Sequence, residues 1–363
     1  MTLGLATVGA SAATKSVKDF SDNDKIDYPE AVEVLMNLGV VGGKDEGNYD
    51  PDAELKRSEG ATIIARMLLG ETISKQLEAQ TASEIFTSDM TNHWAAGYVD
   101  YLTKAGIIAG KGKDASGKDM FDPDGTLTTT EFGKMLLAAL GYDAEIEGLV
   151  GSDWAINTAK LASQTGLYNG NPEAMGSAAV TREETALYAF NALKIPMVEY
   201  NSLNQRQYVT STQARDTQTI STATINDGSW AGTYMVEFGE RYFPQLVRNT
   251  HDKDIWGRPQ TTWTLNLAKI GSYVNSDLMV ASWTNEGTTG AKVFEALGGS
   301  NQLGANNILG VYANNIQTRN RKVSLSSTCS IYQVARLRSE FAETRSWMIQ
   351  NQSSAPLRNQ RKS

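Results

Sequence analysis

Three tetrapeptides in the sequence carry a variable second residue and end on a glutamate: Lys56-Arg57-Ser58-Glu59, Thr128-Thr129-Thr130-Glu131 and Thr181-Arg182-Glu183-Glu184. A threonine followed three residues later by a glutamate has the spacing of a helix capping box, which explains these two residue types. Capping does not explain Arg57 and Arg182, because the helix dipole disfavours a cation at the first helical position. A planar guanidinium binds a carboxylate through two parallel hydrogen bonds. The two arginines are therefore candidates for binding an acidic ligand, and the alternative is that they are solvated surface residues.

The tetrapeptides belong to a longer unit that the chain repeats. Equivalent glycines precede them at Gly39, Gly106 and Gly166, each within a turn. The helix predicted after each tetrapeptide has small or apolar residues at the same positions: Ala61, Ile64, Ala65 and Leu68; Gly133, Leu136, Leu137 and Leu140; Ala186, Ala189, Phe190 and Leu193. Such a period indicates one supersecondary unit that buries its apolar face on its neighbours. We therefore predict three helix–loop–helix repeats, at residues 18–70, 86–142 and 143–195.

The repeated pattern resembles the S-layer homology family, through the tetrapeptide, the preceding Gly-rich loop and the Gly-Ile/Val-Ile/Val turn. The resemblance covers about half of the chain. It implies a mainly α-helical region in which three repeats form a pseudo-threefold bundle. It also implies that the tetrapeptide arginine lies in a groove between repeats and binds a wall glycan that carries a pyruvate ketal. The implied glycan-binding residues are Arg57, Ser58, Trp94, Trp154, Thr181 and Arg182, with Asp22, Asp89, Asp153 and Thr129 as secondary candidates.

Several of these residues have a simpler explanation. Trp94 and Trp154 begin the first helix of their repeats, where an indole can stack on a sugar ring or fill the core. Asp22, Asp89 and Asp153 can accept sugar hydroxyls, although we expect them to cap the following helices. Thr129 replaces the arginine in the second tetrapeptide. That groove is therefore expected to lack the group that pairs with an anion.

The composition argues against several classes of partner and site. The chain has 363 residues and a net charge of −8, and its acidic body argues against a nucleic-acid partner. Its single cysteine excludes an intramolecular disulfide, and its two histidines leave little for a metal site, so no cofactor or metal is expected. No segment reaches the roughly 18 apolar residues of a membrane span. Residues 1–13 resemble the end of a secretory signal, which predicts a secreted protein.

The remaining sequence differs in character from the repeats. Residues 196–228 are rich in Ser, Thr, Gln and Asn and are interpreted as a linker. Residues 229–299 regain aromatic residues and predict a small α+β module. In residues 300–363, Lys and Arg outnumber Asp and Glu nine to two, so this basic tail is either disordered or translated out of frame.

We expect a non-enzymatic protein of the bacterial cell surface, held to the wall through a secondary cell-wall polysaccharide. One alternative is an anchored enzyme in which residues 229–299 begin a truncated catalytic region. The other is a structural subunit that self-assembles in an S-layer lattice. Neither a hydrolase motif nor a phosphate-binding glycine loop is found.

Overall fold

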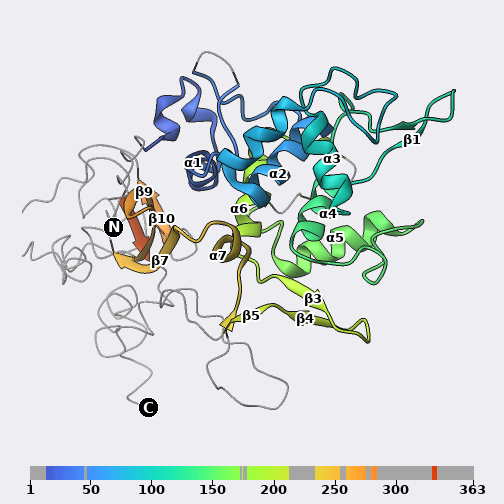
Figure 1. Ribbon diagram of the computed structural model, residues 1–363. Coiled ribbons are helices and arrows are strands. Elements are labelled where there is room, and N and C mark those ends of the chain that lie inside the picture. Colours follow the sequence, from blue (N-terminus) through green and yellow to red (C-terminus); the bar gives the residue numbers. More distant parts are fainter. Residues whose placement is uncertain are drawn as a thin grey trace, which may run out of the picture. The chain divides into compact units, whose positions relative to one another are not determined.

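A computed structural model (Figure 1) describes residues 14–44, 47–171, 174, 178–211, 234–253, 259–274, 279–283 and 329–332. The predicted leader, at residues 1–13, lies outside the described residues. So do most of the basic tail and the second half of the predicted linker. The described residues hold the repeats and the first part of the region that follows them.

Six helices form the three predicted helix–loop–helix units. They are α1 (Pro29–Asn37) and α2 (Arg57–Ser74), α3 (Ala96–Lys104) and α4 (Thr129–Ala139), and α5 (Trp154–Thr165) and α6 (Arg182–Leu193). Pro29 begins α1, where its missing amide hydrogen is not needed. Gly39, Gly106 and Gly166 follow the first helix of each unit with φ angles of 72°, 73° and 81°. Glycine adopts this left-handed conformation without steric cost, so the predicted turns are confirmed.

The helices pack between units. α1 contacts α6, α2 contacts α3, and α4 contacts α5. The predicted apolar face of the second helices is buried at every position except Leu68, which is half-buried. Leu68 lies two residues before Gly70, where a φ of 72° interrupts the regular helix. The face that the sequence predicted therefore makes most of the core.

A ring of backbone hydrogen bonds joins the three segments that precede the tetrapeptides. The amide of Leu55 donates to the carbonyl of Val180 at 3.0 Å, Leu127 donates to Leu55 at 2.9 Å, and Val180 donates to Leu127 at 2.9 Å. All three side chains are at most 2% exposed. The ring fixes which unit lies beside which, because each bond joins residues that are far apart in the sequence.

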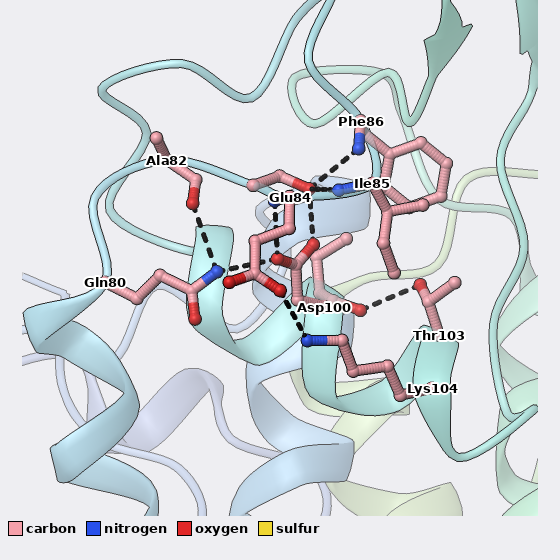
Figure 2. Close-up of polar contacts among 10 residues, drawn as sticks. Gln80, Ala82, Glu84, Ile85, Phe86, Asp100, Thr103 and Lys104 are labelled. Carbon is pink, nitrogen blue, oxygen red and sulfur yellow. Dashed lines mark hydrogen bonds and ion pairs between the residues drawn. The ribbon is translucent and has the colours of Figure 1, made fainter.

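The buried carboxylate of Asp100 in α3 holds the segment that connects α2 to α3. Asp100 is 1% exposed and accepts hydrogen bonds from Gln80 Nε2 at 2.6 Å, from the Glu84 amide at 2.7 Å and from the hydroxyl of Ser83. Figure 2 shows Gln80 and Glu84 beside Asp100. The Ser83 hydroxyl in turn accepts the amide of Phe86 at 2.8 Å. Because a buried carboxylate must be satisfied by donors, Asp100 ties the entry of the second unit to α3.

Short strands, three 3₁₀ helices and one short helix complete the described residues. The 3₁₀ helices are η1 (Val17–Asp19), η2 (Asn23–Lys25) and η3 (Lys75–Ala79). Antiparallel pairs are formed by β1 (Gly112–Lys113) and β2 (Asp119–Met120), β3 (Val198–Tyr200) and β4 (Arg206–Tyr208), β5 (Thr210–Ser211) and β6 (Tyr234–Met235), and β10 (Met279–Trp283) and β11 (Cys329–Tyr332). The strands β7 (Leu246–Lys253), β8 (Pro259–Leu265) and β9 (Ala268–Val274) form a sheet in this order. The described helix α7 (Phe238–Tyr242) precedes them.

The region after the repeats divides between two compact units. One contains the chain up to Arg248 together with Trp263–Gly271, and the other contains Asn249–Thr262 and the residues from Ser272 onward. In the first unit, α7 packs on α2 and α6, and the indole of Trp263 donates to Glu30 of α1 at 2.7 Å. Part of the predicted α+β module therefore belongs to the same unit as the helices.

Buried charges accompany this packing. Arg248 pairs with Glu237 at 3.0 Å, and both side chains are largely buried. Burial raises the pKa of Glu237 to about 7, although Arg248 acts to lower it. Burial also lowers the pKa of Lys194 to about 8, although the coulombic attraction of Glu30 opposes this. These groups join α6, α7 and β7 through ionisable side chains as well as apolar ones.

Candidate functional site

The tetrapeptides begin their helices as the sequence predicted. Thr128 and Thr181 accept hydrogen bonds from the amides of Glu131 and Glu184, both at 3.2 Å, and each glutamate accepts the threonine amide in return. In the first unit, Glu59 accepts the amide of Lys56 at 2.9 Å. These reciprocal bonds satisfy amides that the helix itself leaves without a partner. Thr181 therefore has a capping role.

Arg57 lies against the second unit and is not a solvated surface residue. Its Nε donates to the carbonyl of Phe121 at 3.1 Å, and its Nη2 donates to the carbonyl of Ala109 at 3.2 Å. The guanidinium lies 4.7 Å from the centre of the Phe121 ring, and the residue is 4% exposed. The alternative of a surface arginine is wrong, because the fork of donors joins two carbonyls of the neighbouring unit.

Arg182 makes the same contacts with the first unit. Its Nε donates to the carbonyl of Tyr49 at 2.9 Å, and its Nη2 donates to the carbonyl of Gly42 at 2.7 Å. Its guanidinium lies 5.2 Å from the Tyr49 ring centre. Tyr49 and Gly42 hold the positions in the first unit that Phe121 and Ala109 hold in the second. The two arginines thus donate to equivalent carbonyls, although Arg57 is buried and Arg182 is half-buried.

Asp22 and Asp89 hold the loops that supply those carbonyls. Asp22 accepts the amides of Tyr49 and Asp50 at 2.9 and 2.7 Å, and Asp89 accepts those of Phe121 and Asp122 at 3.0 and 2.6 Å. Burial acts to raise the pKa of Asp22, but the hydrogen bonds from these amides lower it below its usual value. The expectation that the two aspartates cap the following helices is wrong. Asp153 is the residue before α5 but makes no side-chain cap.

A first pocket of about 200 Å³ lies beside Arg182. Its lining includes the turn of the first unit, side chains of α2 and an indole from the second unit: Gly42, Glu59, Thr62, Arg66, Trp94 and Arg182. Trp94 is 51% exposed and stacks against His93 with 5.6 Å between the ring centres. Trp94 and Arg182 were both predicted to bind the ligand, and the structure brings them to one pocket.

A second pocket of about 280 Å³ lies beside Arg57. Its lining includes the turn of the second unit, side chains of α4 and an indole from the third unit: Arg57, Ala109, Lys111, Glu131, Lys134 and Trp154. Arg57 and Trp154, also predicted, therefore meet here. Each pocket combines residues that come from three units.

The two pockets differ in the cations that they contain and in the carboxylates that pair with these cations. In the second, Glu131 pairs with Lys111 and lies 3.6 Å from Nη1 of Arg57. Burial alone would raise the pKa of Glu131, but the hydrogen bonds from Lys111 and the Thr128 amide lower it below its usual value. In the first pocket, the extra cation is Arg66, whose Nη2 lies 3.7 Å from Glu78.

Three lysine and arginine side chains in the pockets were missed by the sequence reasoning: Arg66, Lys111 and Lys134. For Arg66 in α2 and Lys134 in α4 the only sequence signal was helix phase, and Lys111 lies in the loop after α3, where no such signal applies. Lys134 follows the predicted core position Gly133 and so lies at the border of the buried face. Ser58 was predicted to bind the ligand, but it is 1% exposed and its amide donates to the carbonyl of Pro123 at 3.1 Å. It is therefore not accessible to a ligand.

Thr129, which replaces the arginine in the second tetrapeptide, is buried. It is 4% exposed, its amide donates to Ala178, and its carbonyl accepts the hydroxyl of Tyr168 at 3.2 Å. The hydroxyl of Tyr168 therefore lies against the backbone of Thr129.

Comparison with known proteins matches the first two copies of the repeated pattern. Two segments match the S-layer homology domain. They are residues 19–60 and 87–128, which contain the first tetrapeptide and the loops that bind Arg57 and Arg182. The third repeat, at residues 143–195, stays a prediction. Within the described residues, no group of side chains suited to a metal ion is found, and no helix has the length and apolar character needed to cross a membrane.

The curated relatives are surface proteins and enzymes. A cell surface protein of Thermoanaerobacter kivui is 29% identical over 52% of this chain and 23% of its own length. An S-layer protein of Bacillus licheniformis is 26% identical over 41% of this chain and 16% of its own length. An amylopullulanase of Thermoanaerobacterium thermosulfurigenes is 28% identical over 50% of this chain and 10% of its own length. The chain thus covers less than a quarter of each of these relatives. Together with the domain match, they indicate a secreted protein of the cell surface.

Proposed function

We propose that this chain anchors a secreted surface protein to the bacterial cell wall by binding a pyruvylated secondary cell-wall polysaccharide. Its partner is then a glycan, and the described residues act as a binding module without catalysis. The matched domain and the surface-protein relatives support wall anchoring. The pocket geometry supports an acidic carbohydrate as the ligand.

The proposal includes three S-layer homology repeats in a pseudo-threefold bundle. The cyclic hydrogen bonds among Leu55, Leu127 and Val180 support it, because each unit donates to one neighbour and accepts from the other. The helix contacts follow the same cyclic order, with α2 on α3, α4 on α5 and α6 on α1. A unit that buries its apolar face on both neighbours is expected of a closed repeat array.

The observation that carries the binding proposal is the pairing of an indole with cations in each pocket. Trp94 faces a pocket that contains Arg66 and Arg182, and Trp154 faces one that contains Arg57, Lys111 and Lys134. The apolar face of an indole suits the C–H face of a sugar ring, and the cations suit an acidic substituent. Trp94 is half-exposed although it could have filled the core, which favours a role in contact with a ligand.

A lattice role and an enzymatic role stay alternatives for the whole protein. Relatives named S-layer protein support the first, and the relative named amylopullulanase supports the second. Both roles are compatible with wall anchoring by the repeats, because the repeats can anchor either a lattice subunit or an enzyme.

Titration of the full chain with purified pyruvylated wall polysaccharide tests the proposal. We expect saturable binding, and loss of one stacked indole in each pocket should weaken it at least tenfold in the variant Trp94→Ala/Trp154→Ala. Tyr208→Ala is the matched control, because Tyr208 is 52% exposed and lines neither pocket. Binding of the double variant as tight as that of the parent would contradict the proposal.

A further inference from the structure

In the second pocket the ammonium of Lys134 lies over an indole ring and has no carboxylate as an ion-pair partner within the described residues. Its Nζ lies 5.5 Å from the ring centre of Trp154, and the side chain is half-buried in the second pocket. Within the part of the chain that the structure describes, Nζ has neither an ion pair nor a hydrogen bond. Burial without an anion lowers the pKa of Lys134, so its charged form bears a cost in the free protein.

The other two cations of the second pocket are already engaged. Arg57 donates Nε and Nη2 to carbonyls, and its Nη1 lies near Glu131. Lys111 pairs with the same glutamate oxygen. A ligand carboxylate that approached either of them would compete with the carboxylate of Glu131. Lys134 is free of that competition.

We propose that Lys134, and not the tetrapeptide arginine Arg57, is the residue of the second pocket that pairs with the acidic group of the bound sugar. The inference rests on the proposed function, because it concerns the same ligand and the same pocket. Arg57 then acts as a positioning residue that holds the turn Ile107–Gly110 against the pocket. The ligand class is a pyranose that carries one carboxylate, with the ring against Trp154 and the carboxylate toward Nζ.

The positions equivalent to Lys134 give the pockets different specificity. In the first unit the equivalent residue is Thr62, whose hydroxyl donates to the carbonyl of Ser58 at 2.9 Å. In the third unit it is Leu187, which is buried. Only the second of the two described pockets therefore has a lysine here. We expect the second pocket to discriminate an acidic sugar from its neutral counterpart more strongly than the first.

The experiment measures binding of two probes to the full chain in a Trp94→Ala background, which weakens the first pocket. The probes are the pyruvate ketal of a methyl hexopyranoside and the same sugar without the ketal. We expect the acidic probe to bind about tenfold more tightly, as one charge-assisted contact allows. Lys134→Met should abolish this preference while keeping a flexible apolar chain over Trp154. Lys134→Arg should retain it.

Lys160→Met is the matched control, because Lys160 is an exposed lysine of α5 outside the pocket, and it should keep the preference. Retention of the full preference in Lys134→Met, with tight binding intact, would overturn the inference and leave the anchoring proposal standing. Failure of the parent to bind the acidic probe and the wall polysaccharide would overturn both. Loss of the preference in Lys160→Met as well would also overturn the role of Lys134.

Discussion

The first and second pockets share a frame and differ in the side chains placed on it. In both pockets, an arginine from one unit donates hydrogen bonds to two carbonyls of a neighbouring unit, and an aromatic ring lies against the guanidinium. The added cation differs. It is Arg66, beside Glu78, in the first pocket and Lys134, over Trp154, in the second. The frame depends on backbone carbonyls, whereas the charge pattern depends on single side chains that can vary independently.

This difference indicates two roles for residues that a motif would group together. The tetrapeptide arginines donate to carbonyls of a neighbouring unit, those of the buried residues Phe121 and Tyr49 among them, so their loss affects the fold as well as the pocket. At the border of the second pocket, Lys134 has no carboxylate partner within the described residues, so its loss should affect the ligand more than the fold. A third position, at Thr129, lacks the arginine, and Tyr168 donates to the carbonyl there.

The largest expected effect is a loss of stability when a tetrapeptide arginine is removed, and it should be larger for Arg57 than for Arg182. Arg57→Ala removes the donor to the buried carbonyl of Phe121, so the free energy of unfolding should fall by about 1–3 kcal/mol. Arg182→Ala should cost less, because Arg182 is only half-buried. Urea denaturation of the full chain, followed by circular dichroism, measures both.

Lys56→Ala is the control for this prediction, since Lys56 adjoins Arg57 but pairs with Asp124 on the surface, and it should change stability little. Unchanged stability in Arg57→Ala would show that the arginine is free to serve a ligand. The proposed division between joining and binding residues would then be wrong.

An effect of at most the same size is expected at the position that lacks an arginine. On sequence alone, Thr129→Arg would add the missing cation and strengthen wall binding. Because Thr129 is 4% exposed, we expect the added volume to lower the free energy of unfolding by about 1–3 kcal/mol instead. Wall binding should not improve. Thermal melting and titration of the same variant measure the two quantities, and tighter binding without loss of stability would contradict the packing described here.

The smallest effect is a pH dependence confined to the second pocket. Burial lowers the pKa of Lys134 below its usual 10.5, and its neighbours Arg57, Lys111 and Glu131 share the pocket. An acidic ligand binds the protonated amine, so affinity should fall as the pH rises through this lowered pKa. The first pocket has two arginines, which stay charged across this range.

Titrations with the acidic probe in the Trp94→Ala and Trp154→Ala backgrounds, from neutral pH to about pH 10, compare the pockets. We expect a decline of less than about tenfold in the Trp94→Ala background, where the second pocket dominates. The Trp154→Ala background should show a flatter profile. Equal profiles would remove the distinction between Lys134 and Arg66.

The sequence by itself determined the paired helices of the units, the caps of their second helices and the turns between them. Thr128 with Glu131, and Gly106 after α3, act within three or four residues, so their roles follow from local chemistry. The apolar face of each second helix could also be predicted from the sequence, because the apolar residues repeat at helical spacing along one element.

Only the tertiary structure decided what the arginines contact and which cation faces a pocket. Arg57 meets carbonyls 52 and 64 residues away, and Lys134 meets Trp154 across two units. These pairs depend on the order in which the units lie beside one another, which the long-range backbone ring of Leu55, Leu127 and Val180 sets. Local preference could mark Arg57 as unusual for a helix start, but a buried carbonyl in another repeat supplied the reason.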